Sequence, residues 1–294
     1  MADTSSGKVP IIACVRQAWE FLLTNWRLFL PGAIIVALVS QAGPLVAALT
    51  APPVAQQQTV LESVLGQIIT YLPAMLISLV YTASILRKAV RDEVTGQFGL
   101  TFGADEIRLI GVSAGMACLF VPLISLVVIV LAVTVFSKIA TSEAALEALL
   151  NDPEAMNDAI VAAVGEGGAA ALSLFIMFMF ALFIVLAARL YMVNAATIGE
   201  RRMVIFQTWS WSNGNVLRVL AAMILTVLPI MLIDSFIETL GLNILAAAGE
   251  GTPLIPWLLV RTAITFVGAI TTIPVVALGA IFYKGLRPPG FVPK

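Results

Sequence analysis

Long apolar runs, separated by short polar stretches, make up most of the chain. Six of these runs reach about 20 residues, the length with which a helix crosses the hydrocarbon core of a membrane. The pattern therefore predicts an all-α, polytopic membrane protein, with six transmembrane helices in a single integral membrane domain. We expect the spans at about residues 28–49, 64–86, 104–136, 169–190, 216–237 and 256–282 of the domain 1–294.

The polar stretches differ in charge, and this difference predicts the orientation. Residues 189–222 carry four arginines together with Trp209 and Trp211, a combination typical of the cytoplasmic membrane interface. In the expected topology, every Lys and Arg residue except Lys138 and Arg261 lies on that same side. The positive-inside rule then predicts that both termini are cytoplasmic and that the spans form three in–out–in hairpins.

The segments outside the spans are short. Residues 1–27 are expected to form a cytoplasmic N-terminus with an interfacial amphipathic helix, because apolar residues such as Ile11 and Trp19 share one helical face. A helix of a protein core would show the same face. Residues 137–168 are acidic and are expected outside the cytoplasm, and residues 288–294 form a cytoplasmic tail.

The composition agrees with the membrane class and narrows the chemistry. Hydrophobic residues make up 60% of the chain and charged residues 11%, whereas soluble domains carry about 25% charged residues. The net charge of −1 gives no reason to expect a nucleic-acid partner. The chain has no histidine, and its two cysteines, Cys14 and Cys118, fall in different segments. We therefore expect no metal site, no disulfide and no cofactor.

The first and third hairpins share a weak repeat. Trp19 precedes Asn25 by six residues, and Trp209 precedes Asn215 by the same number. Each pair stands before a span that starts on the cytoplasmic side. The repeat is parallel, unlike the inverted repeats of many secondary transporters.

The third hairpin also resembles a bacterial family. RLYMVNAATIGE, a tryptophan-containing helix followed by NGN, and a last span ending in FYKGLR are similar to the membrane domain associated with glycerophosphoryl diester phosphodiesterases and to YciC-like membrane proteins. The resemblance covers about residues 189–287. It implies a multi-pass protein of the bacterial inner membrane. Gln207-Thr208-Trp209 stands where the family often has a basic residue and serine, and we expect no soluble phosphodiesterase domain and no such activity.

Three functions are weighed. The first is a non-enzymatic scaffold, assembly partner or lipid-organising module, with membrane lipids, a membrane-protein partner or a second copy as its partners. The second is a transporter or lipid-handling permease, suggested by the prolines in five spans and by Asp234 and Glu238. Both acids are expected near the outer end of the fifth span, where an ionisable residue is a weaker sign of function. The third is a membrane-embedded enzyme that acts on lipid. Such an enzyme would need polar groups clustered within the spans, and no such cluster is evident. The first function is preferred because few ionisable residues fall within the spans.

Two groups of residues are candidate sites. The first group would anchor and cap helices at the interface, or would form a headgroup or partner site. Its members are Arg201, Arg202, Trp209, Trp211, Asn213 and Asn215. The second group is a predicted ion pair between Arg261 and one of Asp234 and Glu238, since these residues flank the short connection between the last two spans. The alternative is that all three side chains extend separately to water.

Overall fold

The computed structural model describes residues 8–50, 60–136, 153–247 and 254–288. These residues form helices joined by turns, and no strand occurs among them. Six helical segments are long and apolar enough to cross a membrane, which confirms the predicted all-α polytopic fold. The elements are α1 Ile11–Val39, α2 Ala42–Thr50, α3 Val60–Arg91, η1 Gln97–Gly99, α4 Ala104–Leu131, η2 Ala132–Phe136, α7 Pro153–Leu190, α8 Val193–Glu200, α9 Gln207–Trp211, α10 Val216–Ala247 and α11 Leu254–Leu286.

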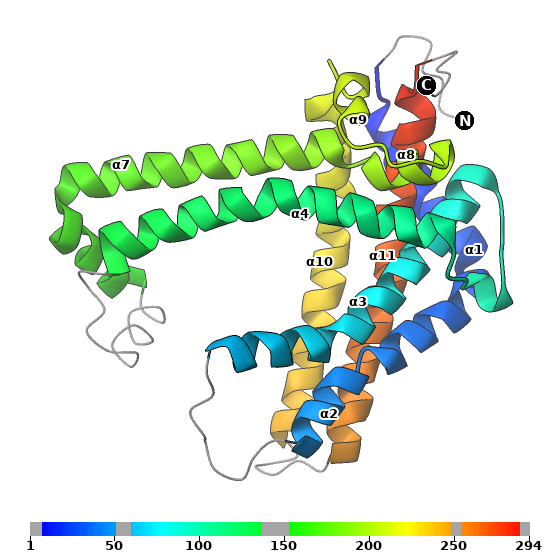
Figure 1. The fold of residues 1–294 in the computed structure, drawn as a ribbon, viewed down its shortest axis with the longest axis horizontal. Helices are drawn as coiled ribbons and strands as arrows, with labels where there is room; N and C mark the ends of the chain where they lie inside the picture. The colour runs from blue at the N-terminus through cyan, green and yellow to red at the C-terminus, as the bar shows by residue number, and fades with distance from the viewer. Residues whose placement is uncertain (1–7, 51–59, 137–152, 248–253, 289–294) are drawn as a thin grey trace. The chain divides into compact units, whose positions relative to one another are not determined.

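The chain divides into two compact units, of which unit 2 is Ser113–Ala187. Most of α4 and α7 lie beside each other in this unit (Figure 1). Phe120 of α4 stacks on Phe183 of α7 with 5.9 Å between the ring centroids. Gly165 has a φ of 75° and interrupts the helical backbone of α7, a conformation that glycine adopts without steric cost. The interruption separates the first part of α7, which begins at Pro153, from the part that contains the fourth span.

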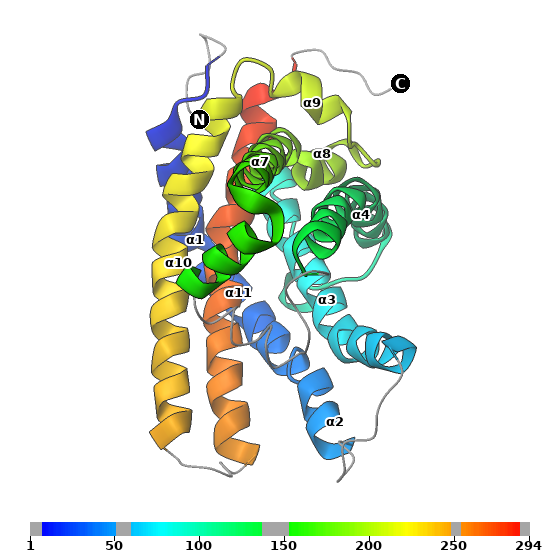
Figure 2. The same ribbon diagram turned by 90° about the vertical axis from the view of Figure 1, so that its left-hand side faces the viewer.

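Unit 1 combines the described residues up to Val112 with those from Ala188 onward. The helices α10 and α11 lie side by side and run antiparallel (Figure 1, Figure 2). The helix α1 packs along α11, and α3 contacts both α1 and α11. The short helices α8 and α9 lie at the end of this bundle where α3 and α11 end (Figure 2).

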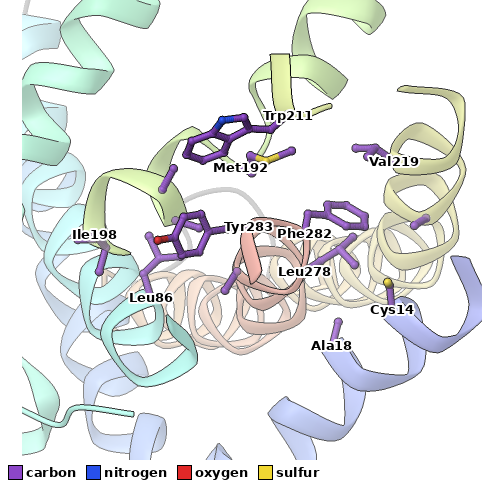
Figure 3. Packing of buried hydrophobic residues seen from close by; sticks show 14 of the residues in the cluster. Cys14, Ala18, Leu86, Met192, Ile198, Trp211, Val219, Leu278, Phe282 and Tyr283 are labelled. Carbon is purple, nitrogen blue, oxygen red and sulfur yellow. The ribbon is translucent and has the colours of Figure 1, made fainter. Parts of the chain in front are cut away.

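Two apolar clusters form the core of unit 1. In the first, Trp211, Met192 and Phe282 converge from different elements (Figure 3), and the Trp211 ring lies 6.1 Å from that of Tyr283. The second cluster lies further along the bundle and includes Phe29 of α1. Within a membrane, lipid is as apolar as these side chains, so close packing rather than escape from water stabilises the second cluster.

The predicted interfacial helix is continuous with the first span. We expected a boundary near Asn25, but α1 runs through it. The Asn25 side-chain amide donates to the Phe21 carbonyl at 2.9 Å, so it stays within the helix and does not cap a new one. The face that carries Ala18 and Leu22 is buried against neighbouring helices, as in a protein core. Membrane contact on the opposite face stays a prediction.

The helix breaks near Pro44. The helix α1 ends at Val39 and α2 begins at Ala42. A proline ring clashes with the carbonyl four residues before it, which here belongs to Ser40, and proline has no N–H to donate. The break therefore falls where Pro44 prevents the helical hydrogen bond to Ser40.

Basic residues gather at one end of unit 1. The Val9 N–H donates to Asn215 Oδ1 at 3.0 Å, which places the start of α1 beside the start of α10. Arg91 at the end of α3 donates to the Ile198 carbonyl of α8 at 3.2 Å. Arg287 pairs with Glu200 with 2.7 Å between Nε and Oε1. The predicted common side of the basic residues thus corresponds to a common end of the bundle.

Single cysteines at Thr95 and Asn243 test which side of the membrane this end occupies. On a background without Cys14 and Cys118, Asn243→Cys is expected to react with an impermeant thiol reagent in intact cells, and Thr95→Cys is not, because the loop after α3 is expected in the cytoplasm. Labelling of Thr95→Cys from outside would reverse the orientation. Ser142, a further position predicted outside, is not among the described residues.

Candidate functional site

A pocket of about 460 Å³ that includes two carboxylates and several hydroxyls in its lining lies between four helices of unit 1. Residues from α1, α3, α10 and α11 line it. Its lining includes two charged residues, Asp234 and Glu238 of α10, and neither Lys nor Arg. The other polar lining groups are hydroxyls, from Ser40, Ser78, Tyr81, Thr82, Thr265 and Thr272. We expected no cluster of polar groups within the spans, and the pocket corrects that expectation.

Asp234 is fixed by a contact between α10 and α11. The Thr271 hydroxyl lies 3.2 Å from Asp234 Oδ1 and 3.4 Å from Oδ2, and donates to the carboxylate. A close approach further along the pair keeps the same register, since a Cβ added to Gly241 would lie 2.8 Å from Ile264 Cδ1. Glu238 follows Asp234 by one helical turn, a spacing that puts the two Cβ atoms about 6 Å apart on one face. Both carboxylates therefore border the same pocket.

Tyr81 of α3 contributes a buried hydroxyl to the pocket wall. Its ring lies edge-on to Phe29, with 6.3 Å between centroids, and against Gly32, where an added Cβ would lie 3.0 Å from two ring carbons. The residue is 2% exposed, and within the described part of the chain its hydroxyl has no hydrogen-bond partner. An unpaired buried hydroxyl costs about 1–3 kcal/mol. A molecule in the pocket would recover this energy only if it reached the hydroxyl, which has almost no accessible surface.

The position of Asp234 along the helix pair bears on its depth in a membrane. Its partner Thr271 comes about 14 residues after Trp257 and about 12 before Tyr283, or about 21 Å and 18 Å along the helix at 1.5 Å per residue. Tryptophan and tyrosine mark membrane interfaces, and a bilayer with its interfaces is about 40–45 Å thick. Tyr283 is buried in the core and so does not mark an interface, but the Asp234–Thr271 contact lies about midway along α11, and a mid-depth position of Asp234 stays a prediction. The helix α10 also continues to Ala247, well past the expected end at residue 237.

The predicted ion pair with Arg261 is absent from the structure. No ion pair among the described residues joins Arg261 to Asp234 or Glu238, and the Arg261 guanidinium lies 5.9 Å from the Trp257 ring centroid instead. The helix register explains this difference. Thr271, which faces Asp234, lies about 15 Å along α11 from Arg261. The arginine therefore lies at the end of the hairpin, where it can reach water.

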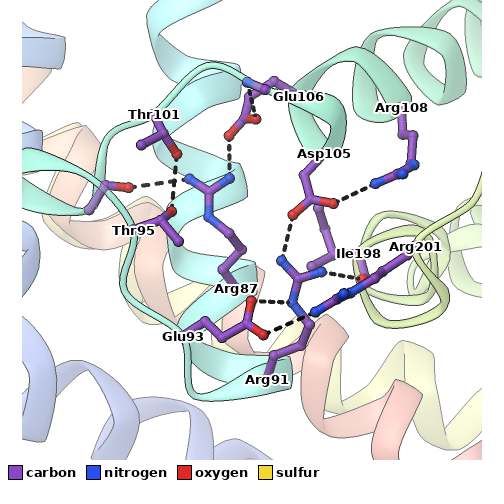
Figure 4. A network of polar contacts seen from close by, with 12 residues as sticks. Arg87, Arg91, Glu93, Thr95, Thr101, Asp105, Glu106, Arg108, Ile198 and Arg201 are labelled. Carbon is purple, nitrogen blue, oxygen red and sulfur yellow. Dashed lines mark hydrogen bonds and ion pairs between the residues drawn. The ribbon is translucent and has the colours of Figure 1, made fainter.

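A second polar cluster joins the end of α3 to the start of α4 (Figure 4). Arg87 and Glu106 form an ion pair whose side chains are 4% and 1% exposed. Arg87 also donates to the Gly99 carbonyl at 3.2 Å, and Glu106 accepts from the Gly103 N–H at 2.9 Å. Both charges therefore bind the backbone of the connecting loop as well as each other.

The cluster extends from this pair to α8. Arg91 lies 2.5 Å from Asp105 and 2.9 Å from Glu93. Arg108 shares Asp105 at 2.8 Å, and Arg201 shares Glu93 at 3.2 Å. Each carboxylate in Figure 4 already has an arginine partner, so the network is suited to holding α3, α4 and α8 together rather than to binding an anion. These ion pairs were not predicted from the sequence.

The six candidate interface residues do not converge on one pocket. Trp211 is buried in the core, and Asn215 is buried with its side chain bound to the Val9 N–H. Trp209 is exposed, with the Arg189 guanidinium 4.7 Å from its ring centroid. Asn213 is exposed as well. A headgroup contact stays a prediction for the exposed members of the group.

The two arginines of this group also differ. Arg201 belongs to the network at Glu93. It has a φ of 53° in the left-handed region, where α8 ends. Arg202 is half-buried next to it. Neither arginine lines the pocket that contains Asp234.

Tyr81 and the hydroxyls around it were also missed from the sequence. A signal was present, since Ser78, Tyr81 and Thr82 follow the three- and four-residue spacing of one helix face inside an apolar span. Serine and threonine are tolerated in membrane helices because they bond to backbone carbonyls. Their spacing alone therefore did not distinguish a pocket wall from ordinary helix residues.

Comparisons with known proteins return no family model, no curated protein and no solved structure that matches the chain. The resemblance of residues 189–287 to the phosphodiesterase-associated membrane domain accordingly stays a prediction. The pocket lined by Asp234 and Glu238 is therefore the main indication of function.

Proposed function

We propose that this multi-pass membrane protein is a transporter or permease whose solute occupies the pocket next to Asp234 and Glu238. The proposal is carried by Asp234 and Glu238, which border one pocket about midway along the paired helices α10 and α11. An ionisable group deep in a membrane is costly, and such groups usually mark substrate paths, ion paths or proton relays. The scaffold was preferred from the sequence because few ionisable residues fall within the spans and both acids were expected near the outer boundary.

Prolines near the pocket also support transport. Pro229 lies five residues before Asp234 in α10, and Pro274 lies three residues after Thr271 in α11. Each proline removes one helical hydrogen bond and provides a point where the helix can bend. Both helices that carry the Asp234–Thr271 contact can therefore change shape beside the pocket, as alternating access requires.

The scaffold or lipid-organising function remains the second candidate. The exposed Trp209 with Arg189 above its ring favours it, because indole and guanidinium groups both suit the headgroup region. In that function Asp234 would serve only to join α10 to α11 through Thr271. The two functions make different demands on water in the pocket, since a solute site must be reached from at least one side.

Accessibility of an introduced cysteine tests the proposal without knowledge of the solute. Thr82→Cys, on a background without Cys14 and Cys118, is expected to react with a small hydrophilic methanethiosulfonate reagent, because the reacting thiolate forms only in water. Met231→Cys is the control, since Met231 lies on α10 outside the pocket lining and is exposed on the bundle surface. No reaction of Thr82→Cys from either side of the membrane would contradict a solute pocket and favour the scaffold.

A further inference from the structure

The charge of the pocket determines which class of solute it suits. Two carboxylates border it, and no basic residue lines it. The described residues contain no group of three or more acidic, cysteine or histidine side chains that could hold a metal ion. Divalent magnesium and calcium ions need six or more oxygen ligands in a tight shell. An anion would face uncompensated repulsion, and a neutral solute would leave both carboxylates without a counter-charge.

The size of the pocket separates an inorganic ion from an organic one. Its volume of about 460 Å³ falls in the range of about 300–1,000 Å³ that is usual for small-molecule sites. A bare monovalent ion would occupy only a small part of that space. Tyr81 is a second, independent sign of a ligand, since the residue lines the pocket and its buried hydroxyl has no partner in the described chain.

We infer that the pocket binds a small organic ammonium ion, with its charged nitrogen held by Asp234 and Glu238 and its hydrogen-bonding capacity shared with Tyr81. A diammonium ion suits the site best, because each carboxylate then has a cationic partner. This inference rests on the proposed transport function and names its substrate class.

Binding of 1,4-diaminobutane to the full chain in nanodiscs tests the inference by titration calorimetry. Ethylamine is expected to bind more weakly, and 1,4-butanediol, which has the same length without charge, is expected not to bind. Asp234→Asn, at the half-buried acid, should weaken diamine binding about tenfold or more, and Glu238→Gln, at the exposed acid, should weaken it about threefold or more. Tyr81→Phe should weaken it about threefold to tenfold while keeping both charges.

Glu20→Gln is the matched control, because Glu20 is an exposed acid on α1 that pairs with Arg16 and does not line the pocket. Diamine binding that survives both acid substitutions would overturn the inference, as would equal binding of the diol. If Asp234→Asn does not fold, an unchanged affinity in Tyr81→Phe and Glu238→Gln would overturn it instead.

Flux in proteoliposomes separates this inference from the proposed function. Asp234-dependent movement of protons or Na⁺ without diamine binding would overturn the organic ammonium and leave the transporter in place. An unreactive Thr82→Cys, together with no flux of diamine, protons or Na⁺, would overturn both. Diamine uptake that Asp234→Asn abolishes and Glu20→Gln leaves unchanged is the expected result.

Discussion

Glu106→Gln is expected to lower the free energy of unfolding by about 3–5 kcal/mol, the range measured when one partner of a buried ion pair is removed. Glu106 and Arg87 are almost fully buried, so glutamine leaves the guanidinium charge without compensation away from water. The substitution also weakens the acceptor for the Gly103 N–H. The loop that joins α3 to α4 should therefore loosen together with the pair.

Reversible unfolding in mixed detergent micelles measures this effect. Glu20→Gln removes the same charge from an exposed pair with Arg16, whose side chains are 74% and 57% exposed for Arg16 and Glu20. It should change stability by no more than about 0.5 kcal/mol. Replacing Arg87 and Glu106 together with methionine should recover most of the loss, because neither charge then remains buried. Equal stability of Glu106→Gln and Glu20→Gln would show that the pair is hydrated.

The sequence predicted the helices well because one physical variable decides them. A run of about 20 apolar residues has to satisfy its backbone hydrogen bonds internally, and a helix does so. The partners of polar residues follow from a different variable, the register between helices. Arg87 and Glu106 come from either end of a loop, and nothing in their spacing shows that both turn inward. The network around them could therefore not be found from hydropathy.

The position of Asp234 along its helix depends on the same variable. Counting about 20 residues from Arg218 puts the acid near the far side of the membrane. The helix continues for about 13 residues beyond Asp234. The contact between Asp234 and Thr271 and the close approach of Gly241 to Ile264 fix the register of α10 against α11. Asp234 then lies about midway along the helix pair, and this position favours the transport function.

Trp209 and Trp211 are the same residue type but differ in exposure. Both are indoles in the short helix α9, and the sequence treated them alike. Positions two apart in a helix point about 200° away from each other, so one side faces inward when the other faces out. Trp211 packs on Tyr283, whereas Trp209 is exposed under Arg189. Contact with α11, which lies far away in the sequence, determines which face of α9 is buried.

The helices α2 and α3 approach each other closely at Gly43. A Cβ added there would lie 1.7 Å from the carbonyl oxygen of Thr70. That atom belongs to a helix backbone, which cannot rotate away as a side chain can. Small residues let membrane helices approach in this way, and packing at such contacts holds the helices together.

Gly43→Ala is therefore expected to separate α2 from α3 and to destabilise the protein by about 1–3 kcal/mol, as overpacking does. Alanine gains about 1 kcal/mol in helix propensity over glycine, so the measured loss is what remains after that gain. Gly66→Ala is the control, since Gly66 lies one turn before Thr70 in the same helix and has no atom within 4 Å of an added Cβ. It should be neutral or slightly stabilising.

If both variants unfold at the same denaturant concentration as the unsubstituted protein, α2 does not contact the α3 backbone at Thr70. If only Gly43→Ala is destabilised, the close approach is required, and a cysteine pair at Ala42 and Thr70 should cross-link in the unsubstituted background more readily than in the Gly43→Ala background.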